Sequence, residues 1–225
     1  MCGRYTLTQP EAIVEELCEV GDVEVLQPLQ PRYNIAPSQA VPIVRPRRDT
    51  GTWAVANVRW GLVPLWAKDP AIGNRMINAR AETAASKPAF RHSFAHRRCL
   101  VLADGFYEWQ PATGAKQPFH IRRPDGRGLL LAGLWARWEK GEQPLDTFTI
   151  LTTEANATLR PIHHRMPVIL DHPAAATWLD PVAERHDLAP LLVAARDDLL
   201  QPRPVSREVN RPANDRPSLI EPIDR

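Results

Sequence analysis

Residues 99–109 carry the clearest indication of the fold, because an apolar run changes at Asp104 into alternating aromatic and polar side chains: Cys99-Leu100-Val101-Leu102-Ala103-Asp104-Gly105-Phe106-Tyr107-Glu108-Trp109. A short apolar run bounded by polar residues and glycine is typical of a buried β-strand. Cys99–Ala103 is therefore predicted as a strand and Gly105 as a turn. Six further short apolar runs predict strands: Val41–Arg45, Trp53–Trp60, Phe119–Arg123, Leu129–Trp135, Thr147–Thr152 and Val168–Leu170.

Helical patterns are fewer than strand patterns. Thr8–Val20 predicts one helix, with Thr8 as its cap, Pro10 in its first turn and Glu11 completing a capping box. Its apolar face is expected to bury Cys18 as a small, unreactive side chain. Shorter helical patterns span Ala81–Ala85, Ala174–Leu179 and Leu188–Ala195. Many closely spaced strands with few helices predict an α+β fold, a single compact domain on an antiparallel, barrel-like β-sheet with a few flanking helices.

The composition bounds the class of protein. With 225 residues, 44% of them hydrophobic and 24% charged, we expect one globular domain over residues 1–225. There is no apolar run near the ~18 residues of a membrane span and no secretory signal pattern, so no membrane partner is expected. The three cysteines lack paired spacing, which argues against a disulfide framework and suits a reducing cytosol. The Pro-rich segment Pro202–Pro217 is expected to form an ordered or partly ordered strap.

The type of basic residue is informative about possible partners, but the net charge is not. All but four of the 28 basic residues are arginine, a side chain that pairs with phosphate in a bidentate fork. The net charge is only +2, and a bias in base composition would also favour Arg, Ala and Pro. Charge alone therefore does not decide whether the partner is a nucleic acid.

Cys2 directly follows Met1, which a methionine aminopeptidase or self-cleavage can remove. Cys2 would then carry an amine and a thiol on adjacent carbons, with reference pKa values of about 7.7–8.0 and about 8.5. An aldehyde can condense with the amine to an imine, and the thiol can close a five-membered thiazolidine. Alternatively, the thiolate attacks an acyl carbon while the amine acts as base. On its own, Cys2 could equally be a small residue of a first strand.

Polar residues lie among aromatics or prolines in four places, where a packed core would not need them: Arg32–Pro37 with Arg59–Trp66, Ile77–Thr83, Cys99–Trp109 and Ile162–Pro167. With the N-terminal Cys2-Gly3-Arg4-Tyr5 and the tail Val205–Asp215, these motifs resemble, in order, those of the SOS response-associated peptidase (SRAP) family. The resemblance covers essentially the whole chain. It implies a compact α+β domain with barrel-like sheets and a positively charged groove. It also implies self-consuming attachment to abasic sites in single-stranded DNA, through a thiazolidine on the N-terminal cysteine.

The resemblance also implies roles for single residues. The catalytic set is Cys2, Asn78, Glu108 and His163. The set expected to bind DNA is Arg4, Asn34, Pro37, Trp60, Trp66, Arg80, Arg165 and Met166. Neither a metal nor a cofactor is expected. The expected partner is single-stranded DNA containing abasic sites, and the protein is expected to be a cytoplasmic, nucleoid-associated monomer.

The chemistry of these residues supports the same roles. An abasic sugar must open before its aldehyde reacts, and a carboxyl such as Glu108 and an imidazole such as His163 can transfer the protons. The aromatic flanks of Glu108 are expected to desolvate it and raise its pKa, although a strand residue facing solvent is an alternative. Asn78 and Arg80 would share one face of an extended segment, or precede the Ala81–Ala85 helix in a capped turn.

Several residues carry a structural alternative. His163 and His164 cannot both face a pocket from an extended strand, so His164 is expected at the surface. No third ligand accompanies the pair at metal-binding spacing. Trp60 and Trp66 either fill the core or stack on unpaired bases. Some members of the family have a second aromatic where this chain has Ala67.

Two other functions remain open at this point. One is an N-terminal-nucleophile thiol peptidase or amidohydrolase, because one class of glutamine amidotransferases also begins Met-Cys-Gly. The other is a passive single-strand binder in which Cys2 is incidental. A passive single-strand binder would not explain the presence of Asn78, Glu108 and His163.

Overall fold

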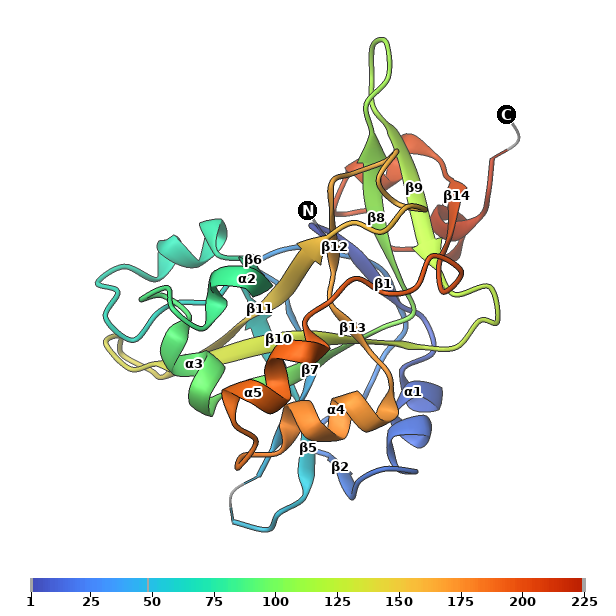
Figure 1. The fold of residues 1–225 in the computed structure, drawn as a ribbon. Helices are drawn as coiled ribbons and strands as arrows, with labels where there is room; N and C mark the ends of the chain where they lie inside the picture. The colour runs from blue at the N-terminus through green and yellow to red at the C-terminus, as the bar shows by residue number, and fades with distance from the viewer. Residues whose placement is uncertain (1, 48, 224–225) are drawn as a thin grey trace.

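Five strands close into a barrel at the centre of the fold (Figure 1). The computed structural model describes residues 2–47 and 49–223. The ring of strands runs through β11 (Leu145–Glu154), β10 (Leu129–Trp138), β7 (Arg98–Ala103), β4 (Ala40–Pro46) and β5 (Trp53–Trp60), and then back to β11. The predicted α+β fold with a barrel-like sheet is confirmed. One detail differs, because β5 and β11 close the ring as a parallel pair rather than an antiparallel one.

Strand β7 explains why the apolar runs were such clear signals. All six of its residues are buried, because it lies between β4 and β10 while helices cover it from outside. Strands buried on both faces have continuous apolar sequences instead of alternating ones. At Gly133 on β10, a Cβ would come within 2.8 Å of the Cys99 sulfur, so the packing there requires glycine.

Shorter strands extend the barrel sheet. They are β2 (Val23–Val25), β6 (Asn78–Arg80), β12 (Arg165–Pro167) and β13 (Ile169–Leu170). Strand β6 pairs in parallel with β11, with Asn78 beside Ile150 and Arg80 beside Thr152. Strand β12 pairs with the same part of β11, so both strands bring their side chains to one region.

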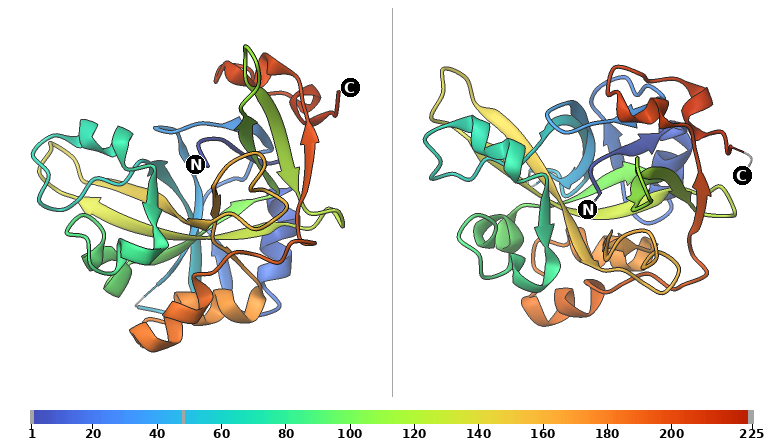
Figure 2. Two further views of the ribbon diagram at one scale, coloured as in Figure 1. Left: turned by 45° about the horizontal axis from the view of Figure 1, so that its top comes forward. Right: turned by 90° about the horizontal axis from the view of Figure 1, so that it is seen from above.

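A second sheet stands beside the barrel. Its strand order is β14 (Gln201–Pro204), β9 (Gln117–Arg122), β8 (Gly105–Gln110), β1 (Tyr5–Leu7) and β3 (Arg32–Ile35). Figure 2 shows β14 beside β9 at the edge of this sheet. Tyr5 pairs with Phe106, so the N-terminal segment lies against β8.

Asp104 connects the two sheets, because it is the only residue between β7 and β8. Its buried carboxylate accepts hydrogen bonds from the Thr6 hydroxyl and from the backbone N–H groups of Thr8 and Gln9. The predicted turn at Gly105 is wrong, since Gly105 is the first residue of β8. A Cβ at this position would collide with the His120 ring, which explains the glycine.

The first helix differs from its prediction at both ends. Helix α1 spans Pro10–Leu17, and its N-cap is Gln9, without a side-chain cap. The predicted capping box at Thr8 is wrong, because the Asp104 carboxylate already binds the backbone N–H groups there. Cys18 is exposed rather than buried, because the helix ends one residue earlier and Cys18 is its C-cap.

The other helices lie outside the barrel. Helices α2 (Ala81–Ala84) and α4 (His172–Leu179) confirm two predictions, whereas α3 (Arg91–His96) was not predicted. In place of a helix over Leu188–Ala195, the chain forms α5 (Arg185–Leu188) and the 3-10 turn η2 (Ala189–Leu191). Pro190 has no N–H with which to continue the helix. Further 3-10 turns are η1 (Pro70–Arg75), η3 (Arg207–Asn210) and η4 (Pro217–Ile220).

The predicted strap Pro202–Pro217 contains most of β14, all of η3 and the first residue of η4, and from here on the C-terminal strap denotes residues 201–223. Val205, Val209 and Leu219 pack with Tyr107 in a small separate core beside β8. The strap is thus part of the second sheet and its packing. Within the described residues, no helix has the length and apolar character needed to cross a membrane.

Candidate active site

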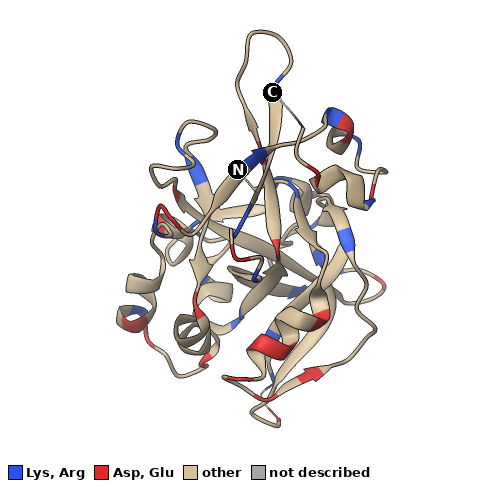
Figure 3. Ribbon diagram, turned by 90° about the vertical axis from the view of Figure 1, so that its right-hand side faces the viewer, with Lys and Arg blue, Asp and Glu red and all other residues tan. Residues whose placement is uncertain are grey.

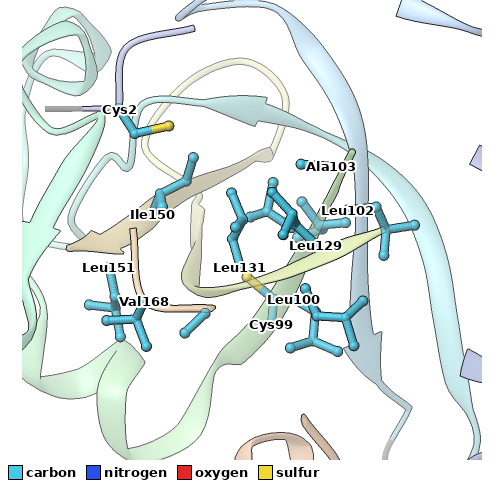
Figure 4. Close-up of a cluster of buried hydrophobic side chains, with 14 of the residues drawn as sticks. Cys2, Cys99, Leu100, Leu102, Ala103, Leu129, Leu131, Ile150, Leu151 and Val168 are labelled. Atoms are coloured by element: carbon cyan, nitrogen blue, oxygen red, sulfur yellow. The ribbon is translucent and has the colours of Figure 1, made fainter. Parts of the chain in front are cut away.

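Cys2 lies at the edge of the barrel core. Its side chain is fully buried, and Figure 4 shows it near Ile150, at the border of the apolar cluster in which Cys99 lies deeper. Asn78 Nδ2 donates a hydrogen bond of 2.8 Å to the Cys2 carbonyl oxygen. This bond ties the N-terminal segment to β6. Burial raises the pKa of the Cys2 thiol far above its usual range, and the charge of Glu108 raises it further.

Glu108 is the second buried member of the site. It lies on β8 between β1 and β9, and only 4% of its surface is exposed. Loss of solvent raises the pKa of its carboxyl, which is the predicted direction, but the flanking Tyr107 and Trp109 pack with the strap and are not the cause. The alternative of a strand residue facing solvent is therefore excluded. Tyr5 on β1 pairs with Phe106 on β8, which brings the N-terminal segment to the strand of Glu108, and the charge of this carboxyl adds to the rise in the Cys2 pKa.

His163 is half-buried just before β12, and His164 is exposed, as predicted. The two rings stack with centroids 4.4 Å apart. His163 Nδ1 lies 3.0 Å from the Arg165 backbone N–H, which can donate to it, and 3.3 Å from the Arg165 carbonyl oxygen. Burial lowers the pKa of His163, which keeps the imidazole neutral.

Asn78 and Arg80 lie on the same side of β6, two residues apart. Asn78 is half-buried where it binds Cys2, whereas Arg80 is exposed. Arg80 lines a hollow of about 400 Å³ together with Glu154, Arg160, His164 and Arg165. The expected shared face is confirmed, and it leads from the buried cysteine toward solvent.

Arg165 faces this hollow but is already paired. Its guanidinium forms two parallel hydrogen bonds of 2.8 Å with the Glu82 carboxylate, and its side chain is only 9% exposed. The guanidinium in turn lowers the pKa of Glu82. A DNA phosphate at Arg165 would compete with Glu82. The neighbouring Met166 is fully buried and belongs to the core rather than to a channel wall.

Trp60 is a core residue, which corrects the expectation that it lines a DNA channel. It is 1% exposed, and its indole N–H donates to the Ile77 carbonyl oxygen at 2.8 Å. Tyr5 packs on the indole edge to face, and Phe148 stacks on it. A base cannot reach either face of the ring. Trp66, in contrast, is 54% exposed.

Arg4 and Asn34 hold the strap, which corrects their expected place on a DNA surface. Arg4 Nη1 donates to Asn34 Oδ1 and to the Val209 carbonyl oxygen, both at 2.8 Å. Buried Asn34 donates to the carbonyl oxygens of Val209, Arg211 and Asn214. Both side chains thus satisfy strap carbonyls, while Pro37 is half-buried on the loop after β3.

Sequence reasoning missed Glu82 and Asp104. Glu82 lies 83 positions from Arg165, and Asp104 lies 98 positions from Thr6. No local pattern joins partners so far apart in the chain. For Asp104, an acid directly after a fully apolar strand was the one available signal.

Comparisons with known proteins bear on this arrangement. The family model described as SOS response associated peptidase (SRAP) matches residues 1–212. The chain is 39% identical over 227 residues to "Abasic site processing protein YoaM" of Bacillus subtilis, covering 98% of each chain. It is 32% identical over 231 residues to "Abasic site processing protein YedK" of Escherichia coli, covering 99% of this chain and 100% of that one.

A vertebrate relative and a solved structure extend the comparison. The chain is 34% identical over 264 residues to "Abasic site processing protein HMCES" of Gallus gallus, covering 100% of this chain and 78% of that one. A crystal structure of a Bacteroides thetaiotaomicron protein superposes with a TM-score of 0.86 at 24% identity, covering 99% of this chain and 100% of that one. At that identity, the likeness shows a shared fold.

Proposed function

This chain belongs to the SOS response-associated peptidase (SRAP) family, and from that membership and the site geometry we propose that it processes abasic sites in DNA by a covalent crosslink through Cys2. YoaM, YedK and HMCES are all named abasic site processing proteins. The observation that carries the proposal is that the second residue of the chain is a buried cysteine beside the buried Glu108 carboxyl.

The chemistry requires a free amine on Cys2. Met1 lies outside the described residues, and its removal is part of the proposal. The amine adds to the aldehyde carbon of an opened abasic sugar, and loss of water leaves an imine. The thiol sulfur then bonds to that carbon, its proton passes to the nitrogen, and a thiazolidine closes. One water leaves overall, and neither an oxidant nor a reductant is consumed.

Glu108 suits the proton transfers around the imine. Because burial raises its pKa, it keeps a proton closer to neutral pH than an exposed glutamate does. It can give this proton to the hydroxyl that departs as water and take one back when the thiol closes the ring. A positioned acid or base typically contributes about 10²–10⁴-fold to a rate.

His163 suits the opening of the sugar ring. The closed hemiacetal needs a proton delivered to the ring oxygen while its hydroxyl loses one. A neutral imidazole carries one N–H that can deliver the proton and one nitrogen that can accept it, and the Arg165 backbone keeps the ring oriented through Nδ1. Asn78 would hold the Cys2 backbone still during both stages.

Single-stranded DNA is the proposed substrate form. Trp66 exposes its indole, which can stack only on an unpaired base. Arg80 presents an exposed guanidinium beside the reactive residues and suits a phosphate. We further propose that the protein acts as a monomer at nucleoid DNA in the cytoplasm.

A peptidase acting on other proteins is the second candidate, since the family description names a peptidase. Attack on a separate protein would require an accessible thiolate, yet Cys2 is fully buried and burial strongly raises the pKa of its thiol. The peptide bond between Met1 and Cys2 is covalently held next to this thiol and needs no access from outside. We therefore propose self-catalysed removal of Met1, with Glu108 as the base that accepts the thiol proton, rather than general peptidase activity.

Intact-mass spectrometry tests the crosslink directly. After mixing with an abasic single-stranded oligonucleotide, the protein should gain the oligonucleotide mass less one water, starting from the form without Met1. Cys2→Ala should abolish this product. Cys18→Ala is the matched control, because that thiol is exposed and lies outside the site. An equally heat-stable adduct on Cys2→Ala would contradict the thiazolidine.

A further inference from the structure

A cleft of about 660 Å³ lies apart from the candidate active site and shares none of the described residues of that site. It opens where β4 and β10 meet the end of α3 and the residues after α4. We call it the basic cleft. Five of its lining residues are arginines: Arg45, Arg47, Arg97, Arg98 and Arg137.

The basic cleft concentrates one sign of charge in a chain whose net charge is only +2. Basic and acidic positions are interspersed over the ribbon (Figure 3). Of the described residues that line the cleft, none is Asp or Glu. Carboxylates outside the lining pair with three of the arginines: Asp146 with Arg45, Glu24 and Asp49 with Arg47, and Glu139 and Asp146 with Arg137. Arg97 and Arg98 make no such ion pair among the described residues, so the uncompensated charge of the cleft is concentrated on them.

Arg97 shows most clearly that the cleft lacks an anion. Its Nη1 is buried and has no hydrogen-bond partner among the described residues. A buried donor without an acceptor is costly, and such a group in a native protein calls for an explanation. An anionic oxygen in the cleft would supply the acceptor.

Arg98 adds a fixed charge at the floor of the cleft. Its nitrogens donate to backbone carbonyl oxygens, among them those of Trp178 at 2.7 Å and Phe94 at 3.0 Å. Desolvation lowers the pKa of this guanidinium, and the nearby charge of Asp180 offsets that shift only in part. Carbonyl oxygens hold Arg98 in place without neutralising it.

Trp135 holds two of the arginines ready. The guanidinium carbons of Arg45 and Arg97 lie 4.5 and 4.8 Å from the centre of its ring. Stacking restrains long side chains that would otherwise lose conformational entropy on binding. The guanidinium is planar and donates in a fork that matches phosphate oxygens. The cleft is therefore preorganised for phosphate.

We propose that the basic cleft binds phosphate groups, several at a time. Their source is either the backbone of a DNA strand that extends beyond the reactive site or a free polyphosphate. The DNA source rests on the proposed function, whereas the phosphate chemistry does not. Since no described cleft residue belongs to the reactive site, binding here is separable from the Cys2 reaction.

Calorimetric titration of the full chain with inorganic tripolyphosphate tests the site. We expect saturable binding that weakens about tenfold in Arg97→Gln, the typical effect of losing one charged hydrogen bond. Arg137→Gln should act in the same direction and keeps the test valid if Arg97→Gln is unstable, because its side chain is 44% exposed. Arg196→Gln is the matched control, since this exposed arginine pairs with Asp198 away from the cleft.

Fluorescence anisotropy with a labelled oligothymidylate without abasic sites identifies the source. If the strand lies in the cleft, Arg97→Gln weakens its binding and flattens the salt dependence. If only tripolyphosphate binding responds, the ligand is a free polyphosphate. Unchanged affinity for both probes in Arg97→Gln and Arg137→Gln would overturn the proposal. Cys2→Ala protein should bind both probes as the wild type does, so failure of the crosslink and failure of the cleft can be told apart.

Discussion

The candidate active site and the basic cleft handle charge in opposite ways. At the active site, burial favours the uncharged forms of Cys2, Glu108 and His163, since it raises the first two pKa values and lowers the third. In the basic cleft, arginines keep their charge whatever surrounds them. Side chains that change protonation state near neutral pH can exchange protons with a substrate. Arginines stay charged, so they can attract an anionic ligand but cannot act as its acid or base.

Removing the nucleophile should give the largest effect. Cys2→Ser leaves the amine, so borohydride should still trap an imine with abasic DNA, but no stable product should form because a hydroxyl closes the ring poorly. Denaturing gels with and without borohydride measure both species. A heat-stable, unreduced Cys2→Ser adduct would show that the thiol is dispensable.

Glu108→Gln comes next, because it keeps the shape of the side chain and removes its titratable proton. The rate of crosslinking should fall by about 10²–10⁴-fold in single-turnover assays, with little change in single-strand affinity. Glu19→Gln, at an exposed position after α1, is the control. Loss of affinity in Glu108→Gln would mark the residue as structural instead.

His163→Ala tests whether His163 assists the opening of the sugar ring while Glu108 assists the later steps at the imine. It should slow crosslinking to a closed abasic sugar but leave the reaction with a pre-opened aldehyde analogue near normal, because only the first substrate needs ring opening. Comparing the two rates in one variant provides the measurement. Equal slowing on both substrates would contradict this role.

Keeping a buried histidine uncharged makes the free energy of unfolding depend on pH, and His120 is the side chain that should show this. Burial lowers the pKa of His120 to about 3, whereas the unfolded imidazole titrates near 6.5. Between these values the unfolded state binds one more proton, so the free energy of unfolding should fall by about 1.4 kcal/mol per pH unit as the pH drops. His120→Gln should reduce that slope in urea unfolding from pH 6 to 4, unlike the exposed His186→Gln. Parallel slopes would mean that His120 is protonated in the fold.

Arg80→Ala should have the smallest effect and tests the permanent charges beside the active site. Losing one phosphate contact should weaken single-strand binding and flatten its logarithmic salt dependence by about one unit. Anisotropy over a range of salt concentrations gives the slope. If slope and affinity stay unchanged, Arg80 is a solvated surface residue.

Short-range patterns predicted the barrel well. Trp53–Trp60 is a strand with the predicted bounds, and Cys99–Ala103 differs from β7 by one residue. Strand β7 is buried on both faces, and β5 is mostly buried with only Asn57 exposed, so their apolar sequences carry the signal directly. Strands β1, β3 and β8 were not predicted as strands. They are short, and their mixed polar and aromatic sequences fit a sheet only once partner strands are present.

The candidate site was predicted in part. Glu108 is buried with a raised pKa as predicted, although its flanks Tyr107 and Trp109 pack with the strap on the other side of β8. His164 is exposed as predicted, although the two histidines precede β12 and their rings stack instead of pointing to opposite sides. The places of Arg4, Asn34 and Trp60 did not follow, because their partners lie on the strap or across the barrel. The basic cleft could not be foreseen either, since its arginines come from separate elements.

The order of residues therefore specified the α+β class, the barrel strands and the candidate site residues, because these depend on hydrophobic periodicity and residue chemistry near each position. Only the folded chain decided that Cys2 and Trp60 are buried and which arginines share a hollow. Burial and charge pairing arise from contacts such as Arg165 with Glu82, 83 residues apart, and no local pattern encodes the partner. The pKa values of Cys2, Glu108 and His163, and with them the chemistry of the site, are properties of that packing.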